Sequence, residues 1–178
     1  MEEMHLKELY VAYSDSIYYY LARRSGSEEV AFDLMQDTFV RAGIYYKNVE
    51  NPKAWLFMIA RNILIDYMKD AKKNEGSSHD ETLTFMNLAS AENIEDNVNW
   101  KILKSNILKK LDEENKILPE IFLLRLDYEL THKEIAEVVN IPFRTIRRYF
   151  EKIRNIIYNN FKDELDIKDS QNYGQAYE

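Results

Sequence analysis

The segment from Thr131 to Ile157 constrains the fold of this chain most, because two amphipathic helical patterns meet there at a turn. Thr131 and Glu134 have the spacing of a capping box, in which each side chain accepts a hydrogen bond from the backbone N–H of the other residue. Asn140 tolerates the left-handed conformation that ends helices, and Pro142 suits a first helical turn. The pattern therefore predicts one helix starting at Thr131, a turn near Asn140, and a second helix after it.

The expected second helix has one apolar and one basic face. Its apolar side chains recur with the helical period at Ile146, Phe150, Ile153 and Ile157. The side chains left facing outward include Arg144, Arg147, Arg148 and Lys152. Such a helix can enter the major groove of DNA, where arginines reach guanine edges or phosphates, so the segment favours a DNA-binding helix-turn-helix. The alternative is a solvated basic face on an ordinary helical hairpin, and this segment alone leaves both open.

The composition predicts an all-α protein, since the 178 residues include only 4 Gly and 3 Pro and no segment alternates like a strand. The absence of Cys excludes disulfides and thiolate metal sites, and the scattered His5, His79 and His132 do not form a metal-binding pattern. We therefore expect no metal or other cofactor. No signal sequence or membrane-spanning stretch is evident, so a cytoplasmic protein without direct membrane insertion is expected.

The net charge of −7 argues at first against a nucleic-acid partner, but the charge is unevenly distributed. Residues 51–74 hold five basic and two acidic side chains, and residues 131–162 hold seven basic and three acidic ones. These basic islands can bind phosphates locally, because screening limits electrostatic interactions to about 8 Å at physiological salt. The acidic total would weaken unassisted DNA binding, which suggests that a partner brings the chain to DNA.

Two helices are expected in the first part of the chain, at residues 3–24 and from Glu28 to about Gly43. The second should bury a stripe of small and apolar residues: Ala31, Leu34, Met35, Thr38 and Ala42. Its opposite face then carries Asp33, Gln36, Asp37 and Arg41. Like charges four residues apart repel unless something outside the helix uses them, as a basic protein partner would. A merely solvated polar face explains the pattern equally well.

A third helix is expected from Pro52 to about Lys73. Its expected core stripe is Leu56, Ile59, Ala60, Ile63 and Tyr67. Its exposed face would carry Trp55, Asn62, Asp66, Lys69 and Lys73. Aromatic rings interleaved with lysines suit single-stranded DNA, because rings stack on bases while ammonium groups follow phosphates. The alternative places the Trp55 ring in the core.

Residues 75–93 lack cations and a clear period, so they are expected to form an acidic linker between two small helical domains at 1–74 and 94–163. Within the second domain we expect helices at 94–111 and 113–126 before the helix-turn-helix, although Pro119 falls inside the latter range. Residues 164–178 are an acidic tail, which is expected to be frayed.

Three segments in this order resemble the extracytoplasmic-function (ECF) sigma factors of bacterial RNA polymerase. Residues 29–42, EVAFDLMQDTFVRA, are similar to the helix of that family that binds the core polymerase. Residues 51–69, NPKAWLFMIARNILIDYMK, resemble the segment that melts and reads the −10 promoter element. Residues 123–157 resemble the domain that reads the −35 element, although Arg144 and Asn140 stand where the family usually has Gly. The resemblance covers nearly the whole chain.

The resemblance implies a promoter-specificity subunit, which is not itself an enzyme and acts on no small-molecule substrate. The residues expected to bind the polymerase are Asp33, Gln36, Asp37 and Arg41. Those expected at the opened −10 strand are Tyr45, Tyr46, Lys47, Asn48, Trp55, Arg61, Asn62 and Lys69. Those expected at the −35 duplex are Thr131, Arg144, Thr145, Arg147, Arg148 and Lys152.

The implied partners are core RNA polymerase, promoter DNA and an anti-sigma factor. An alternative from the C-terminal island alone is a stand-alone helix-turn-helix regulator, whose N-terminal domain serves for dimerisation or effector binding. An enzyme has little support, because the sequence contains no glycine-rich phosphate loop, metal-ligand cluster or activated nucleophile.

Overall fold

The computed structural model describes residues 2–45, 49–75 and 98–165, and the regular structure in these ranges is entirely helical. The helices are α1 (Glu2–Ser25), α2 (Glu28–Tyr45), α3 (Pro52–Glu75), α4 (Val98–Glu114), α5 (Leu118–Leu126), α6 (His132–Val139) and α7 (Phe143–Phe161). The predicted all-α class is therefore confirmed. None of the helices in these ranges is long and apolar enough to cross a membrane.

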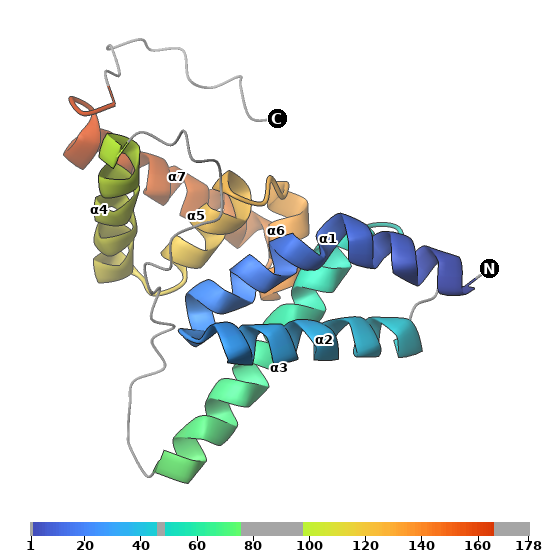
Figure 1. Cartoon of the computed structure of the whole chain (residues 1–178). Helices are drawn as coiled ribbons and strands as arrows, with labels where there is room; N and C mark the ends of the chain where they lie inside the picture. The colour runs from blue at the N-terminus through green and yellow to red at the C-terminus, as the bar shows by residue number, and fades with distance from the viewer. Residues whose placement is uncertain (1, 46–48, 76–97, 166–178) are drawn as a thin grey trace.

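Helices α1, α2 and α3 form one packed group, in which α1 and α2 run in opposite directions and α3 crosses both (Figure 1). Gly26 makes the turn from α1 to α2 in the left-handed conformation that glycine adopts most easily. The predicted inner stripe of α2, from Ala31 to Ala42, is buried throughout. The helix continues two residues past the predicted end at Gly43, to Tyr45.

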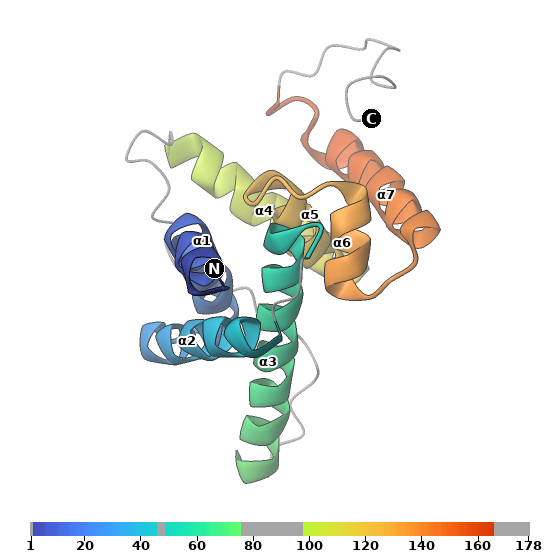
Figure 2. The same cartoon turned by 90° about the vertical axis from the view of Figure 1, so that its right-hand side faces the viewer.

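The core-facing side of α3 differs from the predicted stripe. Tyr67 was expected in the core but is 39% exposed, while Phe57 and Leu64 are fully buried. The last turns of α3 extend past the neighbouring helices (Figure 2). Tyr67 is exposed because of the side of the helix on which it lies, since the next residue, Met68, still packs against the core. Nearer its start, α3 contacts α6 as well as α1 and α2, which explains why apolar residues on more than one side are buried.

Helices α4 to α7 form the second packed group. The predicted helix at 113–126 begins later than expected, because α4 runs through Glu114 and α5 starts only at Leu118. Pro119 lies in the first turn of α5, where its missing backbone N–H has no intrahelical partner to lose. Of the helix predicted at 94–111, residues 94–97 lie outside the described residues.

The start of α6, the turn and α7 lie where the sequence predicts them. Thr131 and Glu134 form both hydrogen bonds of the capping box, and Asn140 ends α6 in the left-handed conformation. In α7 the buried residues include Ile146 and Ile153, as expected. The next fully covered position is Ile156, whereas the predicted Ile157 is half-buried.

The two groups of helices pack against each other, mainly through the first half of α3 and helix α6 (Figure 2). Their apolar side chains belong to one continuous core. The predicted linker at 75–93 lies outside the described residues except for Glu75, which ends α3, and only residues 164–165 of the predicted tail are described. The division into domains at 1–74 and 94–163 remains a prediction.

Candidate protein and nucleic-acid interfaces

The outer face of α2 presents all the side chains expected to bind a protein partner. Asp33, Gln36, Asp37 and Arg41 are exposed, since Leu34, Met35 and Thr38 occupy the inner side of the helix. Sequence reasoning missed that the same face carries the exposed apolar side chains Phe32, Val40 and Ile44. The sequence could have indicated them, because these three residues are apolar but fall outside the predicted inner stripe of the helix. Exposed apolar groups among polar ones are typical of a protein-binding surface.

The basic side of α7 also faces solvent. Arg144, Arg147 and Arg148 are exposed and Thr145 is half-buried. Thr131, at the start of α6, is exposed as well. The Nζ atom of Lys152 lies 3.3 Å from a carboxylate oxygen of Glu114 on α4, and both side chains are more than two-fifths exposed.

The pKa of His132, at the start of α6, reflects its burial and two nearby arginines, one on α5 and one on α7. The His132 ring stacks on Phe150 with centroids 4.1 Å apart. Partial burial, together with the positive charges of Arg125 and Arg147, lowers the pKa of His132 below its ordinary value of 6.5. The imidazole is therefore neutral at pH 7, and the positive charge of this surface comes from arginine and lysine.

The residues expected at the −10 strand divide into three sets. Tyr45, Asn62 and Lys69 are exposed. Tyr46, Lys47 and Asn48 lie outside the described residues. The other two members of the prediction, Trp55 and Arg61, are partly covered by the second group of helices.

The side chain of Trp55 was expected on the exposed face of α3, but it is half-buried and packs against the core. It lines a pocket of about 380 Å³ between α3 and α6, together with Met58, Lys133 and Glu137. Trp55 is therefore neither fully exposed nor fully in the core, since it packs against core residues and also lines the pocket.

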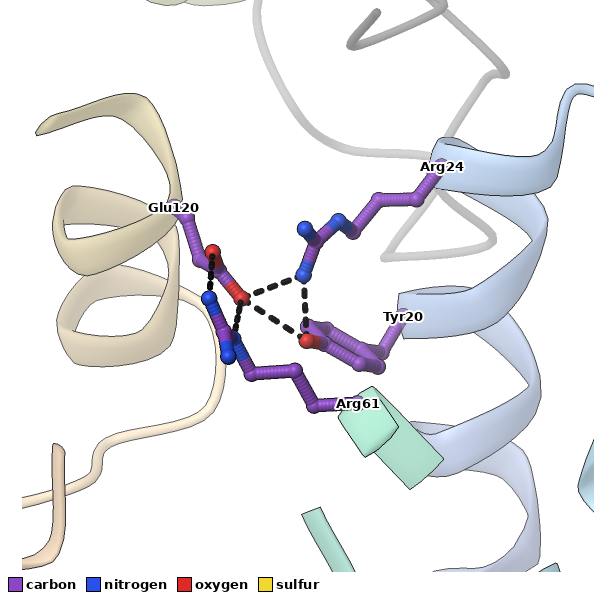
Figure 3. Close-up of polar contacts among 4 residues, drawn as sticks. All are labelled: Tyr20, Arg24, Arg61 and Glu120. Carbon is purple, nitrogen blue, oxygen red and sulfur yellow. Dashed lines mark hydrogen bonds and ion pairs between the residues drawn. The ribbon is translucent and has the colours of Figure 1, made fainter. Parts of the chain in front are cut away.

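Arg61 is bound by a carboxylate from the other group of helices. Its Nε lies 2.9 Å from Oε1 of Glu120 on α5, and its Nη2 lies 3.4 Å from Oε2 of the same residue. The hydroxyl of Tyr20 donates to Glu120 over 2.9 Å, and Arg24 donates both to Glu120 and to that hydroxyl. Figure 3 shows the Glu120 carboxylate facing Tyr20 and Arg24 from α1 and Arg61 from α3.

This cluster is almost inaccessible to water, because the Glu120 side chain is 1% exposed and that of Arg61 is 14% exposed. Burial alone would raise the pKa of Glu120, but the charges of Arg24 and Arg61 outweigh it and hold the pKa below 4.5. Burial also raises the pKa of Tyr20. Glu120 is thus ionised and Tyr20 protonated at neutral pH, as the observed hydrogen bonds require.

A second set of polar contacts joins the helix groups at Asp127, just after α5. One of its oxygens accepts from Arg23 on α1, and the other lies 2.6 Å from Nζ of Lys104 on α4. The Asp127 side chain is 4% exposed, so this ion pair too is well shielded from solvent.

The start of α3 is joined to the start of α6 through Asn51 and Glu134. The side-chain oxygen of Asn51 accepts from the backbone N–H of Ala54 over 3.2 Å, which caps α3, and its amide donates to Glu134. Glu134 also accepts from the backbone N–H of Thr131 over 2.5 Å, within the capping box of α6. Burial would raise the pKa of Glu134, but the hydrogen bonds from Thr131 and Asn51 lower it.

Glu120 is the functional-site candidate that sequence reasoning missed. The sequence did contain an indication, because Glu120 is the single carboxylate within the apolar segment from Leu118 to Leu124. A charge buried in such a segment costs much free energy unless it is paired. Within the described ranges there is no group of three or more His, Cys, Asp or Glu that could hold a metal ion.

Comparison with known proteins gives consistent matches. The Sigma-70 region 2 family model matches residues 9–74, which include α2 and nearly all of α3. RNA polymerase sigma factor YlaC of Bacillus subtilis is 31% identical over 163 residues, which cover 84% of this chain and 87% of that protein. ECF RNA polymerase sigma factor SigM of the same organism is 28% identical over 140 residues, covering 78% of this chain and 83% of that protein.

ECF RNA polymerase sigma factor SigW of Bacillus subtilis is likewise 28% identical over 163 residues, which cover 85% of this chain and 86% of that protein. These alignments extend well beyond the segment matched by the family model. The chain therefore belongs to the ECF group of RNA polymerase sigma factors, which act in transcription initiation.

Proposed function

We propose that this chain is a promoter-specificity subunit that binds core RNA polymerase through α2, the −35 duplex through α7 and the opened −10 strand through α3. Residues 1–74 form its polymerase-binding and −10 domain, and residues 94–163 form its −35 domain. The linker at 75–93 joins them. The observation that carries the proposal is that α2 and α7 present their acidic and arginine faces outward on separate helices.

The α2 face suits a protein partner with basic groups. Its carboxylates, Asp33 and Asp37, are exposed and repel each other in the free chain, so a cation between them would relieve that repulsion. The exposed Phe32, Val40 and Ile44 add apolar contact area beside them. Charge complementarity would then orient the complex while apolar burial stabilises it. The core polymerase is the partner that the ECF relatives imply.

The α7 face suits duplex DNA. Arg144, Arg147 and Arg148 project from the first turns of the helix, which is the end that contacts base edges in helix-turn-helix proteins. Lys152, one turn further along, can reach a phosphate once it leaves Glu114. The turn at Asn140 joins α6 to α7, and Thr131 at the start of α6 is exposed.

The α3 face suits single-stranded DNA, although less of it is accessible. Asn62 and Lys69 are exposed, and Tyr45 at the end of α2 is an accessible stacking surface. Trp55 and Arg61, which the second group of helices partly covers, are the remaining proposed contacts to the strand. An anti-sigma factor is the further partner implied by the family, and the cytoplasm is the compartment in which polymerase and chromosomal DNA meet this chain.

The test pairs Asp37→Arg with Asp15→Arg, a charge reversal at an exposed position on α1. Asp37→Arg should abolish co-elution with purified core polymerase on size exclusion, and Asp15→Arg should not. Transcription is then measured on promoters selected from a random duplex pool by the assembled polymerase complex. The proposal fails if the wild-type chain elutes as a stable homodimer with no affinity for polymerase, which would favour a stand-alone regulator.

A further inference from the structure

We propose that Phe143, the first residue of α7, contacts the C5 methyl group of a thymine in the major groove and is a specificity-determining residue of this helix. This role rests on the proposed function of α7 as the reader of duplex DNA. It adds an apolar contact to a set that otherwise consists of arginines, a lysine and threonines. Phe143 was not among the residues expected at the −35 duplex.

The ring of Phe143 is exposed although phenylalanine is among the most often buried residue types. Phe143 is 48% exposed. Of the phenylalanines in the described ranges, only Phe32 and Phe143 are exposed, while the others are buried or pack against the core. Phe32 lies beside the carboxylates of α2, on the face proposed to bind a protein. Phe143 stands on a surface of the opposite charge, so a different kind of partner is expected for it.

The side chains nearest Phe143 on the exposed side of α7 are cationic. Arg144 follows it, and Arg147 lies about one helical turn further along. Among the residues that the structure describes, no carboxylate forms an ion pair with Arg144, Arg147 or Arg148. The first acidic residue of the helix is Glu151. This surface therefore suits a partner that offers negative charge with an apolar group beside it, and duplex DNA offers phosphates and thymine methyl groups.

The backbone at the start of α7 fixes the position of Phe143. The carbonyl oxygen of Pro142 accepts hydrogen bonds from the backbone N–H groups of Thr145 and Ile146, over 2.8 and 3.1 Å. The side chain of Ile146 is fully buried and attaches this first turn to the core. Because Cα–Cβ bonds in a helix tilt toward its N-terminus, the side chain at the first position leans toward the open end of α7. In helix-turn-helix proteins that end contacts base edges.

The arginines of α7 cannot supply what Phe143 offers. Arginine and lysine read guanine edges and bind phosphates, whereas the feature that thymine presents beside its O4 acceptor is a methyl group. Apolar side chains, phenylalanine included, contact that methyl group. Between residues 143 and 152, all of which the structure describes, Phe143 is the only exposed apolar side chain. A thymine methyl read by the first turns of α7 is therefore read by Phe143.

The experiment removes that methyl group from the DNA and the ring from the protein. It uses the complex of the full chain with core polymerase, and a promoter that this complex has selected from a random duplex pool. Each thymine of the −35 element, on either strand, is replaced in turn by deoxyuridine, which lacks only the C5 methyl group. Burial of one methyl group corresponds to about fourfold in affinity. We expect one replacement to weaken binding of the wild-type complex by about that factor in competition anisotropy.

Phe143→Ala should make the complex indifferent to the same replacement, because no ring is left to contact the methyl group. Phe143 is not among the residues packed against the core, so its removal leaves the fold in place. The matched control is Tyr158→Ala, which removes an exposed aromatic side chain near the other end of α7, outside the proposed DNA-binding residues. It should keep the fourfold penalty of the wild type.

The role of Phe143 is overturned if Phe143→Ala keeps the full deoxyuridine penalty, or if no single replacement weakens the wild-type complex. It is also overturned if Phe143→Ala loses core polymerase on size exclusion, since the ring would then contact protein. The proposed function fails separately. If core polymerase does not bind the wild-type chain, the sigma-type function is lost, and the same replacements in duplexes selected by the chain alone decide whether Phe143 reads thymine.

Discussion

Helices α3 and α7 carry the two basic islands of the sequence, but their arginine side chains differ in exposure. Arg147 and Arg148 of α7 face solvent, whereas Arg61 of α3 is 14% exposed and bound to Glu120. The partner of Arg61 lies 59 residues away in sequence. A local charge sum therefore identifies cations that can bind DNA, but whether they are available depends on what a distant part of the chain places over them.

The sharpest way to test this difference is to remove the carboxylate that covers Arg61. Glu120→Gln leaves Arg24 and Arg61 buried without their counter-ion, which should lower the free energy of unfolding by about 3–5 kcal/mol. Glu113→Gln, at an exposed position, should change it by less than about 0.5 kcal/mol. Urea unfolding followed by circular dichroism measures both. If the two substitutions lowered the free energy of unfolding equally, the buried ion pairs of Glu120 would stabilise the fold no more than an exposed carboxylate does.

The same comparison has a pH dependence, set by Tyr20 and Arg24 of α1 and Arg61 of α3 around the Glu120 carboxylate. The pKa of Glu120 is held below 4.5, so its stabilising contribution is complete above pH 4.5 and disappears as the pH falls through the lowered value. The stability difference between wild type and Glu120→Gln should therefore be constant near pH 7 and shrink in acid. A difference that grows below pH 4.5 would contradict the ion-pair account.

On α7, where the arginines are exposed, substitution should affect binding and leave stability alone. Arg147→Ala and Arg148→Ala should each weaken binding of the polymerase complex to −35 duplex DNA by about 1–3 kcal/mol if the side chain contacts a base. Unfolding should be unchanged within about 0.5 kcal/mol. Fluorescence anisotropy with the selected promoter measures the loss, and Lys109→Ala on α4 is the matched cation control. Loss of polymerase binding by either arginine variant would contradict the division of roles between α2 and α7.

Much of this fold was predictable because its information is local. The capping box at Thr131, the turn at Asn140 and the inner stripe of α2 each depend on residues a few positions apart, and each is observed. The face of α3 was harder, because Phe57 and Leu64 extend its apolar residues over more than one side of the helix. The helical period of apolar residues cannot distinguish a face buried within its own group of helices from a face covered by the other group.

The contacts over the candidate site could not be predicted from periodicity at all. Glu120 could be flagged as a charge among apolar residues, but nothing in its neighbourhood indicates that Tyr20, Arg24 and Arg61 converge on it from two other helices. Pro119 gives a smaller example of what periodicity alone fails to predict. Its restriction to a first turn was known from its chemistry, yet the helix pattern alone placed the start of α5 too early.

Thr131 tests the point where the two regions meet, since its capping box orients the Glu134 carboxylate that also binds Asn51 of α3. Thr131→Ala should lower the free energy of unfolding by about 1 kcal/mol, because a backbone N–H at the start of α6 loses its acceptor. Thr131→Ser keeps that acceptor and should restore most of the loss. Urea unfolding of the three chains measures this, and an equal loss in the Ser variant would show that the cap is not the cause.

The smallest expected effect concerns Lys152, whose ion pair with Glu114 is the exposed counterpart of the pair between Arg61 and Glu120. Both partners are more than two-fifths exposed, so solvent screens the attraction and Lys152→Ala should change stability by about 0.2–0.5 kcal/mol. If Lys152 contacts a phosphate when α7 binds DNA, its removal should also reduce the slope of log affinity against log salt by about one. Titrations of the polymerase complex at several salt concentrations measure that slope. Glu114→Gln separates the two roles, because it breaks the ion pair while keeping the lysine; it should leave the slope at its wild-type value, and a slope reduced as much as in Lys152→Ala would assign the effect to the ion pair and not to DNA.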